Sequence, residues 1–187
     1  MKIGTPKEVF EGEARVAMTP DSAKQLQKLG YECVIETGAG SAAGFADAIY
    51  KEAGVEVVKT AAALWKAADV VAKVRQPDAT ELKRLTSDKT LISFFNPAGN
   101  EDGMAAAKAK GANVIAMEMV PRISRAQKMD ALSSMANIAG YRAVIEAGNN
   151  FGRFFTGQIT AAGKVPPAKV LVVGAGVAGL AAIGTST

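Results

Sequence analysis

The sequence predicts an α/β protein: a parallel-sheet domain of the Rossmann-like or flavodoxin-like kind, followed by the truncated start of a second, Rossmann-type domain. Three observations carry this prediction. The 187 residues are 49% hydrophobic, enough for a sizeable core. Short β-branched runs alternate with amphipathic stretches, and a glycine-rich turn near the end follows an apolar run directly.

Six short apolar runs in the first two thirds of the chain are typical of strands. They are Lys2–Thr5, Tyr31–Glu36, Val55–Val58, Val70–Val74, Leu91–Phe95 and Val114–Met117. Helical patterns fall between most of them, and this alternation favours a parallel sheet with helices on both faces.

Helix boundaries come from local signals. Thr19 and Pro20 supply an N-cap and a first-turn proline for a helix that ends at Gly30, and Gly54 and Gly111 end two further helices. The four helices expected in this region are Pro20–Gly30, Ala46–Ala53, Ala79–Leu85 and Asp102–Lys110.

The pattern changes after Met117. Val120–Asp130 is polar and is expected to be a loop at the carboxyl end of a strand, where open parallel sheets bind ligands. A long helix over Ser133–Phe154, a stiff linker over Thr160–Lys169 and a new strand at Val170–Val173 follow. We therefore predict domains at residues 1–132 and 168–187, joined by a connecting helix and linker at 133–167.

Composition excludes several classes of function. The net charge of +4 is scattered, without a basic run, so nucleic-acid binding is not expected. Cys33 is the only cysteine and no leader pattern is present, which favours a reducing, cytoplasmic setting. No apolar run reaches the roughly 18 residues of a membrane span. The chain has no histidine, so no metal site is expected and no mechanism that needs imidazole can operate.

The glycine turn reads Gly174-Ala175-Gly176-Val177-Ala178-Gly179, directly after the apolar run and before an apolar helical stretch. This is the context that the dinucleotide fingerprint requires: a tight turn, close approach of the backbone to a pyrophosphate, and free amides at a helix N-terminus. The acidic residue that should hold the ribose lies roughly 20 residues further on, beyond Thr187. An earlier glycine cluster, Gly38–Ser41, lacks the following apolar helix and is expected to be an ordinary loop.

Two N-terminal motifs, Gly4–Glu8 and Glu13–Pro20, resemble the signature shared by alanine dehydrogenases and the NAD(H)-binding subunit of proton-translocating transhydrogenase. The stretches Pro121–Gln127, Asp130–Ser134, Asn137–Arg142 and Gly157–Pro167 are similar to the transhydrogenase in particular. Alanine dehydrogenases carry a catalytic histidine where this chain has Asn96, which argues against an amino-acid dehydrogenase.

The resemblance implies site residues. Arg122, Gln127, Asp130 and Ser133 would orient the nicotinamide end of NAD(H), and Gly174, Gly176, Val177, Ala178 and Gly179 would hold its pyrophosphate. Hydride transfer between two nicotinamides needs positioning rather than an acid or base, so these residue types suffice. Arg15 and Lys73 match carboxylate-binding positions of alanine dehydrogenases, either as an inherited ligand site or as retained structure.

Three functions remain open at this point. The first is an oxidoreductase subunit that passes hydride from NADH to NADP⁺ held on a partner domain, coupled to proton translocation by partner membrane domains. As such it would be a homodimer, peripheral on the cytoplasmic face of the inner membrane. The second is an alanine-type dehydrogenase, and the third is an inactive fragment that keeps the fold alone.

Overall fold

The computed structural model describes all 187 residues and divides them into two compact units, Met1–Val120 and Pro121–Thr187. The predicted domain boundary at residue 132 falls inside the second unit.

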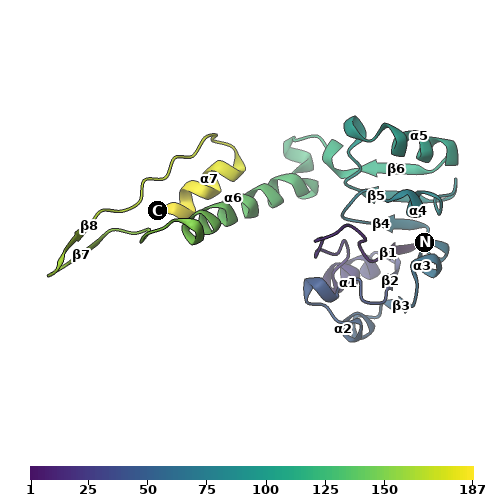
Figure 1. The fold of residues 1–187 in the computed structure, drawn as a ribbon. Coiled ribbons are helices and arrows are strands. Elements are labelled where there is room, and N and C mark those ends of the chain that lie inside the picture. The colour runs from purple at the N-terminus through teal and green to yellow at the C-terminus, as the bar shows by residue number, and fades with distance from the viewer. The chain divides into compact units, whose positions relative to one another are not determined.

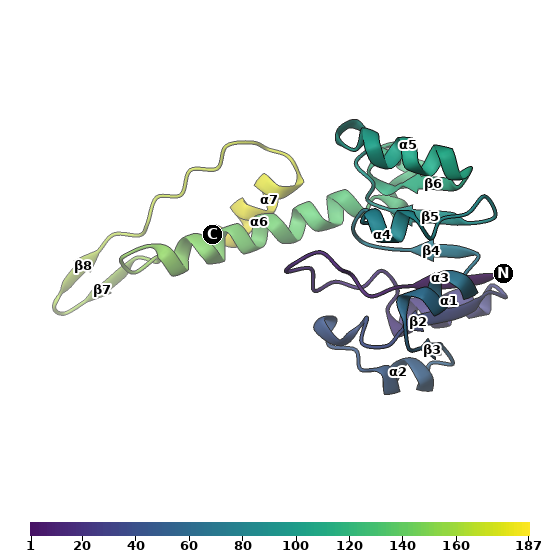
Figure 2. The same cartoon turned by 45° about the vertical axis from the view of Figure 1, so that its right-hand side comes forward.

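The first unit is built on a six-stranded sheet in the order β3-β2-β1-β4-β5-β6, which Figures 1 and 2 show as a ladder. The strands are β1 (Lys2–Thr5), β2 (Glu32–Glu36), β3 (Glu56–Val58), β4 (Val70–Ala72), β5 (Thr90–Ser93) and β6 (Asn113–Ala116). Every neighbouring pair is parallel, which confirms the predicted parallel sheet. The strand order reverses between β1 and β4.

The helices of this unit are α1 (Pro20–Lys28), α2 (Asp47–Glu52), α3 (Ala61–Ala67), α4 (Ala79–Leu82) and α5 (Glu101–Lys110). Thr19 caps α1 as predicted, because its hydroxyl accepts from the Ser22 amide at 3.2 Å and Pro20 opens the first turn. Helix α3 was not predicted. Thr60 caps it by accepting from the Ala63 amide.

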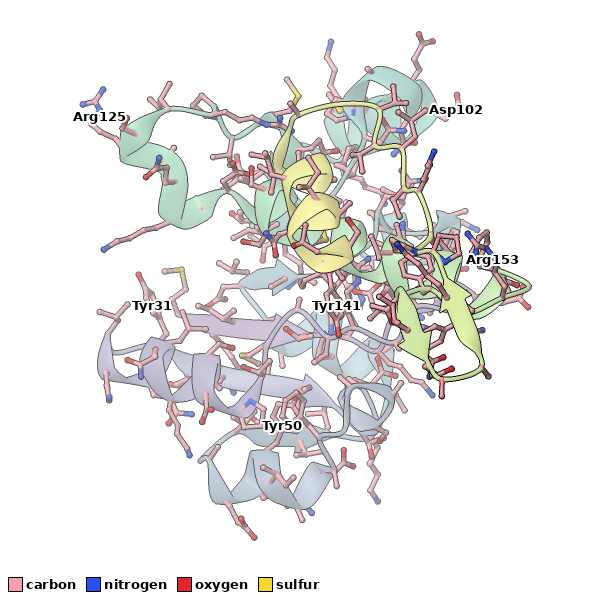
Figure 3. All side chains as sticks on the ribbon, turned by 90° about the vertical axis from the view of Figure 1, so that its left-hand side faces the viewer. Tyr31, Tyr50, Asp102, Arg125, Tyr141 and Arg153 are labelled. Carbon is pink, nitrogen blue, oxygen red and sulfur yellow. The ribbon has the colours of Figure 1, made fainter.

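Both faces of the sheet are covered, and β2 shows how. Cys33 and Ile35 pack into one core cluster with Ala23 and Tyr50 of α1 and α2, whereas Val34 packs into another with Leu64 and Trp65 of α3. Successive side chains of a strand point to opposite faces. Tyr50, labelled in Figure 3, is fully buried, and its hydroxyl donates to the Met18 carbonyl at 2.8 Å.

The second unit consists of a 3-10 helix, η4 (Ser124–Met129), the long helix α6 (Ala131–Asn150), a hairpin of β7 (Gln158–Thr160) and β8 (Gly163–Val165), and α7 (Val177–Ser186). Helix α7 lies against α6, as Figures 1 and 2 show. The polar stretch predicted as a loop is largely η4.

Two predictions for the second unit are wrong. The stretch predicted as a linker, Thr160–Lys169, contains β8 and the last residue of β7, which pair as an antiparallel hairpin. Val170–Val173 forms no strand, although its residues are β-branched or apolar. A strand needs a hydrogen-bonded neighbour, and no neighbouring strand is present for this segment, so Leu171 and Val173 are 88% and 90% exposed.

No helix of the chain combines the length and the apolar character that crossing a bilayer requires.

Candidate functional site

The glycine turn leads into α7 without a side-chain cap. Gly176 occupies the N-cap position, and the first helical hydrogen bond runs from the Leu180 amide to the Gly176 carbonyl at 2.9 Å. The amides of Val177, Ala178 and Gly179 come before Leu180 in the chain and therefore have no acceptor within the helix. They lie at an uncapped N-terminus, where the helix dipole favours an anion.

The three glycines of the turn have different environments. Gly174 has a φ of 116°, which a residue with a side chain rarely adopts. A Cβ at Gly179 would overlap the Gly174 carbonyl group, so the turn closes on itself there. At Gly176 a Cβ would meet no atom of the chain within 4 Å, which leaves open space for a ligand.

Gly140 of α6 sets how closely α7 approaches. A Cβ at this buried position would overlap the Ala178 carbonyl oxygen and would lie 2.8 Å from its carbon. Only glycine therefore permits this approach of the two helices, and the backbone of Ala178 belongs to the predicted phosphate turn.

Asp130 begins α6 as its N-cap. Its carboxylate accepts from the Ser133 amide at 2.9 Å and from the Ser133 hydroxyl at 2.6 Å. These bonds from Ser133, together with the charge of Arg122, lower the pKa of Asp130 below its ordinary value. Asp130 is therefore a fixed carboxylate whose position depends on the start of the helix.

The predicted residues of the second unit line two hollows with shared walls. One, of about 480 Å³, is lined by Arg122, Ile123, Ser124, Gln127, Asp130, Ser133 and Val177. The other, of about 320 Å³, is lined by Arg122, Leu132, Ser133, Ala136, Val173, Gly174, Gly176, Val177, Ala178 and Gly179. Arg122, Ser133 and Val177 belong to both. Arg125, labelled in Figure 3, is exposed and lines neither.

Sequence reasoning missed several lining residues, among them Ile123, Leu132, Ala136 and Val173. These side chains carry no recognisable chemistry. They line the hollows because α6 packs against α7, and the local amino-acid sequence does not predict that packing.

Arg15 and Lys73 lie in the first unit, each paired with carboxylates. The fully buried Lys73 ammonium donates to Glu81 at 2.9 Å and to Glu8 at 3.2 Å. Arg15 pairs with Glu13 at 2.6 Å, and Arg75 reaches the same carboxylate at 2.6 Å. Both predicted cations thus have acidic partners within the chain.

These ion pairs shift two carboxyl groups in opposite directions. The bonds from Arg15 and then Arg75 lower the pKa of Glu13 to about 2. Burial raises the pKa of Glu81 above its ordinary value, against the opposing effect of Lys73.

Asn96 follows β5 in a left-handed conformation with a φ of 54°. The Glu118 carboxylate accepts from the backbone amides of Phe95 and Asn96, and so fixes this corner. The Asn96 amide side chain cannot exchange a proton as an imidazole would.

Family models match nearly the whole chain. The N-terminal domain model described as alanine dehydrogenase/PNT matches residues 4–139, and the C-terminal domain model of the same description matches residues 143–187.

Among curated proteins, all 187 residues are 76% identical to the NAD(P) transhydrogenase subunit alpha of Cereibacter sphaeroides, of which they cover 36%. The subunit alpha of Haemophilus influenzae is 54% identical, again over 36% of its length. The alanine dehydrogenase of Mycolicibacterium smegmatis is more distant, at 34% identity over 96% of this chain and 48% of that protein.

Solved structures give the same ranking. The whole chain superposes on 55% of a transhydrogenase from Sinorhizobium meliloti, with a TM-score of 0.94 and 45% identity. It superposes on 52% of an L-alanine dehydrogenase with a TM-score of 0.87 and 31% identity. The chain thus spans between about a third and a half of the length of the proteins that it resembles.

Proposed function

Because this chain belongs to the alanine dehydrogenase/PNT family, we propose that it is part of the NAD(H)-binding subunit of a proton-translocating nicotinamide nucleotide transhydrogenase. The observation that supports this most directly is the pair of adjoining hollows. Their walls combine the glycine turn with the polar residues of η4 and the start of α6.

The turn has the features that a dinucleotide pyrophosphate requires. Free amides at the start of α7 can donate to phosphate oxygens, and the open space at Gly176 lets those oxygens approach the backbone. We therefore assign Gly174, Gly176, Val177, Ala178 and Gly179 to the pyrophosphate of NAD(H).

Arg122, Gln127, Asp130 and Ser133 are assigned to the nicotinamide end. When bound, NADH supplies a hydride, and NADP⁺ on a partner domain accepts it. The protein groups would neither donate nor remove a proton in this step; they would hold the carboxamide and ribose and so limit the motion of the ring. The hydrogen-bonded Asp130–Ser133 pair provides such a fixed support.

The chain is less suited to alanine dehydrogenation. Asn96, three residues after the end of β5, stands where alanine dehydrogenases carry a histidine, and the chain has no histidine elsewhere. Lys73 and Arg15 are held by Glu8, Glu81 and Glu13, so we infer that the pair is retained structure rather than a working carboxylate site.

Partners follow from the same assignment. We propose that NADP(H)-binding and membrane domains of the transhydrogenase dock with this subunit on the cytoplasmic face of the inner membrane. We also propose a homodimer. One face of α6 exposes Ile138, Tyr141 and Ile145 at helical spacing, with Ile138 65% exposed, and a second copy would cover this apolar stripe.

Gln127→Ala in the complete enzyme tests the function. The Gln127 side chain makes no hydrogen bond within the chain, so its removal leaves the fold intact and deletes a contact to the cofactor alone. We expect hydride transfer, measured by stopped flow between bound nucleotides, to slow about tenfold or more, while NADH affinity changes by less than about threefold.

Arg125→Ala is the matched control, because Arg125 lies on the same 3-10 helix, is exposed and lines neither hollow. Its transfer rate should equal that of the parent enzyme. Equal losses of affinity and rate in Gln127→Ala, or an unchanged rate, would contradict the assignment of Gln127 to ring positioning.

A further inference from the structure

One hollow of the first unit lies away from the carboxyl ends of the strands, between α3 and the segment that connects α4 to β5. Its volume is about 520 Å³. Its lining residues are Ala62, Trp65 and Lys66 of α3, with Lys83, Arg84, Thr86, Asp88 and Lys89. Lys89 directly precedes β5, so this basic cleft opens near the amino end of that strand.

The lining is strongly cationic. Lys66, Lys83, Arg84 and Lys89 contribute four positive charges and Asp88 contributes one negative charge. None of the four cations belongs to an ion pair of the chain. These four cations share one hollow with a single carboxylate, which leaves a net charge of +3, and a bound anion would relieve their mutual repulsion.

Lys89 is the most informative of the four because it is only 7% exposed. Its ammonium donates to the Ala68 carbonyl at 2.7 Å, which leaves two of its three donors unused. Buried charges in proteins are ordinarily paired, since an unpaired charge loses its hydration without compensation. Buried Lys73 forms ion pairs with two carboxylates, whereas buried Lys89 forms none and has only the charge of the exposed Asp88 nearby.

Trp65 supplies an independent observation. It is 1% exposed, and its indole N–H has no hydrogen-bond partner. Buried donors are nearly always satisfied, so the unpaired indole N–H of a residue that lines the cleft is a spare donor for a bound acceptor.

We propose that the basic cleft is a binding site for the phosphate group of a small soluble compound. A phosphate carries up to two negative charges and several acceptor oxygens, which match the cations and spare donors of the cleft. The recessed position of Lys89 favours a soluble compound over a lipid headgroup, which stays in the plane of a membrane. This site is separate from the glycine turn, which lies in the other unit.

The single tryptophan makes the test specific. Trp65 is the only one in the chain, so its emission reports on the basic cleft and not on the glycine turn. The 187-residue chain is titrated with inorganic phosphate at constant ionic strength, with chloride as the reference salt. We expect a saturable change in Trp65 emission with phosphate and none with chloride.

Variants assign the signal to the cleft. Lys89→Met and Arg84→Met should each weaken phosphate binding about tenfold or more, whereas Lys28→Met, an exposed lysine at the end of α1, should bind as the parent does. If Lys89→Met fails to fold by circular dichroism, the double variant Lys66→Met/Arg84→Met carries the test, because neither side chain is buried.

Three results would overturn the proposal. The first is an equal emission change with chloride, and the second is unaltered phosphate binding in Arg84→Met and the double variant. In the third, vesicles of phosphatidylglycerol change the emission while inorganic phosphate does not, which would identify a lipid headgroup instead. None of these results depends on NADH binding, so they test the phosphate site independently of the proposed function.

Discussion

Glu13 holds two arginines of the first unit, Arg15 and Arg75, and this role makes the stability of the chain dependent on pH. Its pKa of about 2 in the folded protein lies below the ordinary value of 4.5. A lowered folded-state pKa contributes stability that is present above pH 4.5 and is lost as the pH falls through 2. Glu81, whose pKa is raised, has the opposite sign: its contribution is present below pH 4.5 and declines above it.

Comparison with Glu13→Gln isolates the first effect. We expect the free energy of unfolding of the parent to fall more steeply than that of Glu13→Gln between pH 4.5 and pH 2, and the two curves to run parallel above pH 5. Urea titrations across this range measure both. Parallel curves throughout would show that the two arginines do not stabilise the Glu13 carboxylate.

Asp130 caps the N-terminus of α6 and is also proposed to hold the nicotinamide end of NAD(H). Two substitutions separate these two roles. Asn can still cap α6 through its side-chain oxygen but carries no charge, whereas Ala removes both. We expect Asp130→Asn to keep the thermal midpoint of the complete enzyme and to slow hydride transfer. Asp130→Ala should lower the midpoint as well, as calorimetry beside stopped-flow kinetics would reveal. A full transfer rate in Asp130→Asn would remove the charge of Asp130 from the mechanism.

At the scale of elements, the contact between α6 and α7 depends on Gly140. Its replacement by Ala forces the helices apart at Ala178, and such overpacking costs about 1–3 kcal/mol. Gly148 of the same helix is the control, because a Cβ there meets only Phe155, at an ordinary 3.9 Å. Gly148→Ala should stabilise the chain by up to about 1 kcal/mol through its higher helix propensity.

Denaturant titrations give the two stability changes, and NADH titration of the complete subunit gives the consequence for the turn. Gly140→Ala should weaken NADH binding and Gly148→Ala should not. Equal stability in both variants would mean that α7 can shift at no cost, and that the approach at Gly140 does not position the turn.

The sequence predicts elements where local and tertiary signals agree. All six strands of the first unit were expected. Their β-branched runs are buried between the helices on the two faces of the sheet, and glycines mark where several of the preceding helices end. The cap at Thr19 was evident for the same reason. Helix α3 was missed although Thr60 is a good N-cap residue and the alanines after it favour a helix. Its seven residues are too few to show a clear helical periodicity of apolar side chains.

The second unit was harder to predict, for physical reasons. Val170–Val173 has the composition of a strand, but pairing decides whether a strand forms and composition cannot supply a neighbour. The three-residue strands of the β7–β8 hairpin are exposed throughout, so no alternation marks them. The site residues Arg122, Gln127 and Ser133 were named through the family resemblance; their residue types alone would equally describe a solvated loop.

At the scale of the whole molecule, the 187-residue chain should bind NADH weakly and should catalyse no hydride transfer by itself. It supplies the glycine turn of the dinucleotide fingerprint but covers only 36% of the length of the Cereibacter sphaeroides subunit alpha that it resembles. Helix α7 has ten residues, a length at which helices depend on their packing. Calorimetric titration with NADH measures the affinity. Micromolar binding would show that Arg122–Ser133 and the turn hold the nucleotide unaided.

The strand order of the first unit also affects the order in which the strands can assemble during folding. Strand β1 is made first, yet it lies in the middle of the sheet, between β2 and β4. The Lys2 amide reaches its acceptor on Asp69 across 67 positions of the chain. Closing so long a loop precedes any gain from the contact, and topologies rich in such contacts fold slowly. The half-sheet β1-β2-β3 can form early, but its inner edge stays open until β4 arrives, so the joining of the two halves at β1 should limit the rate at which this protein folds.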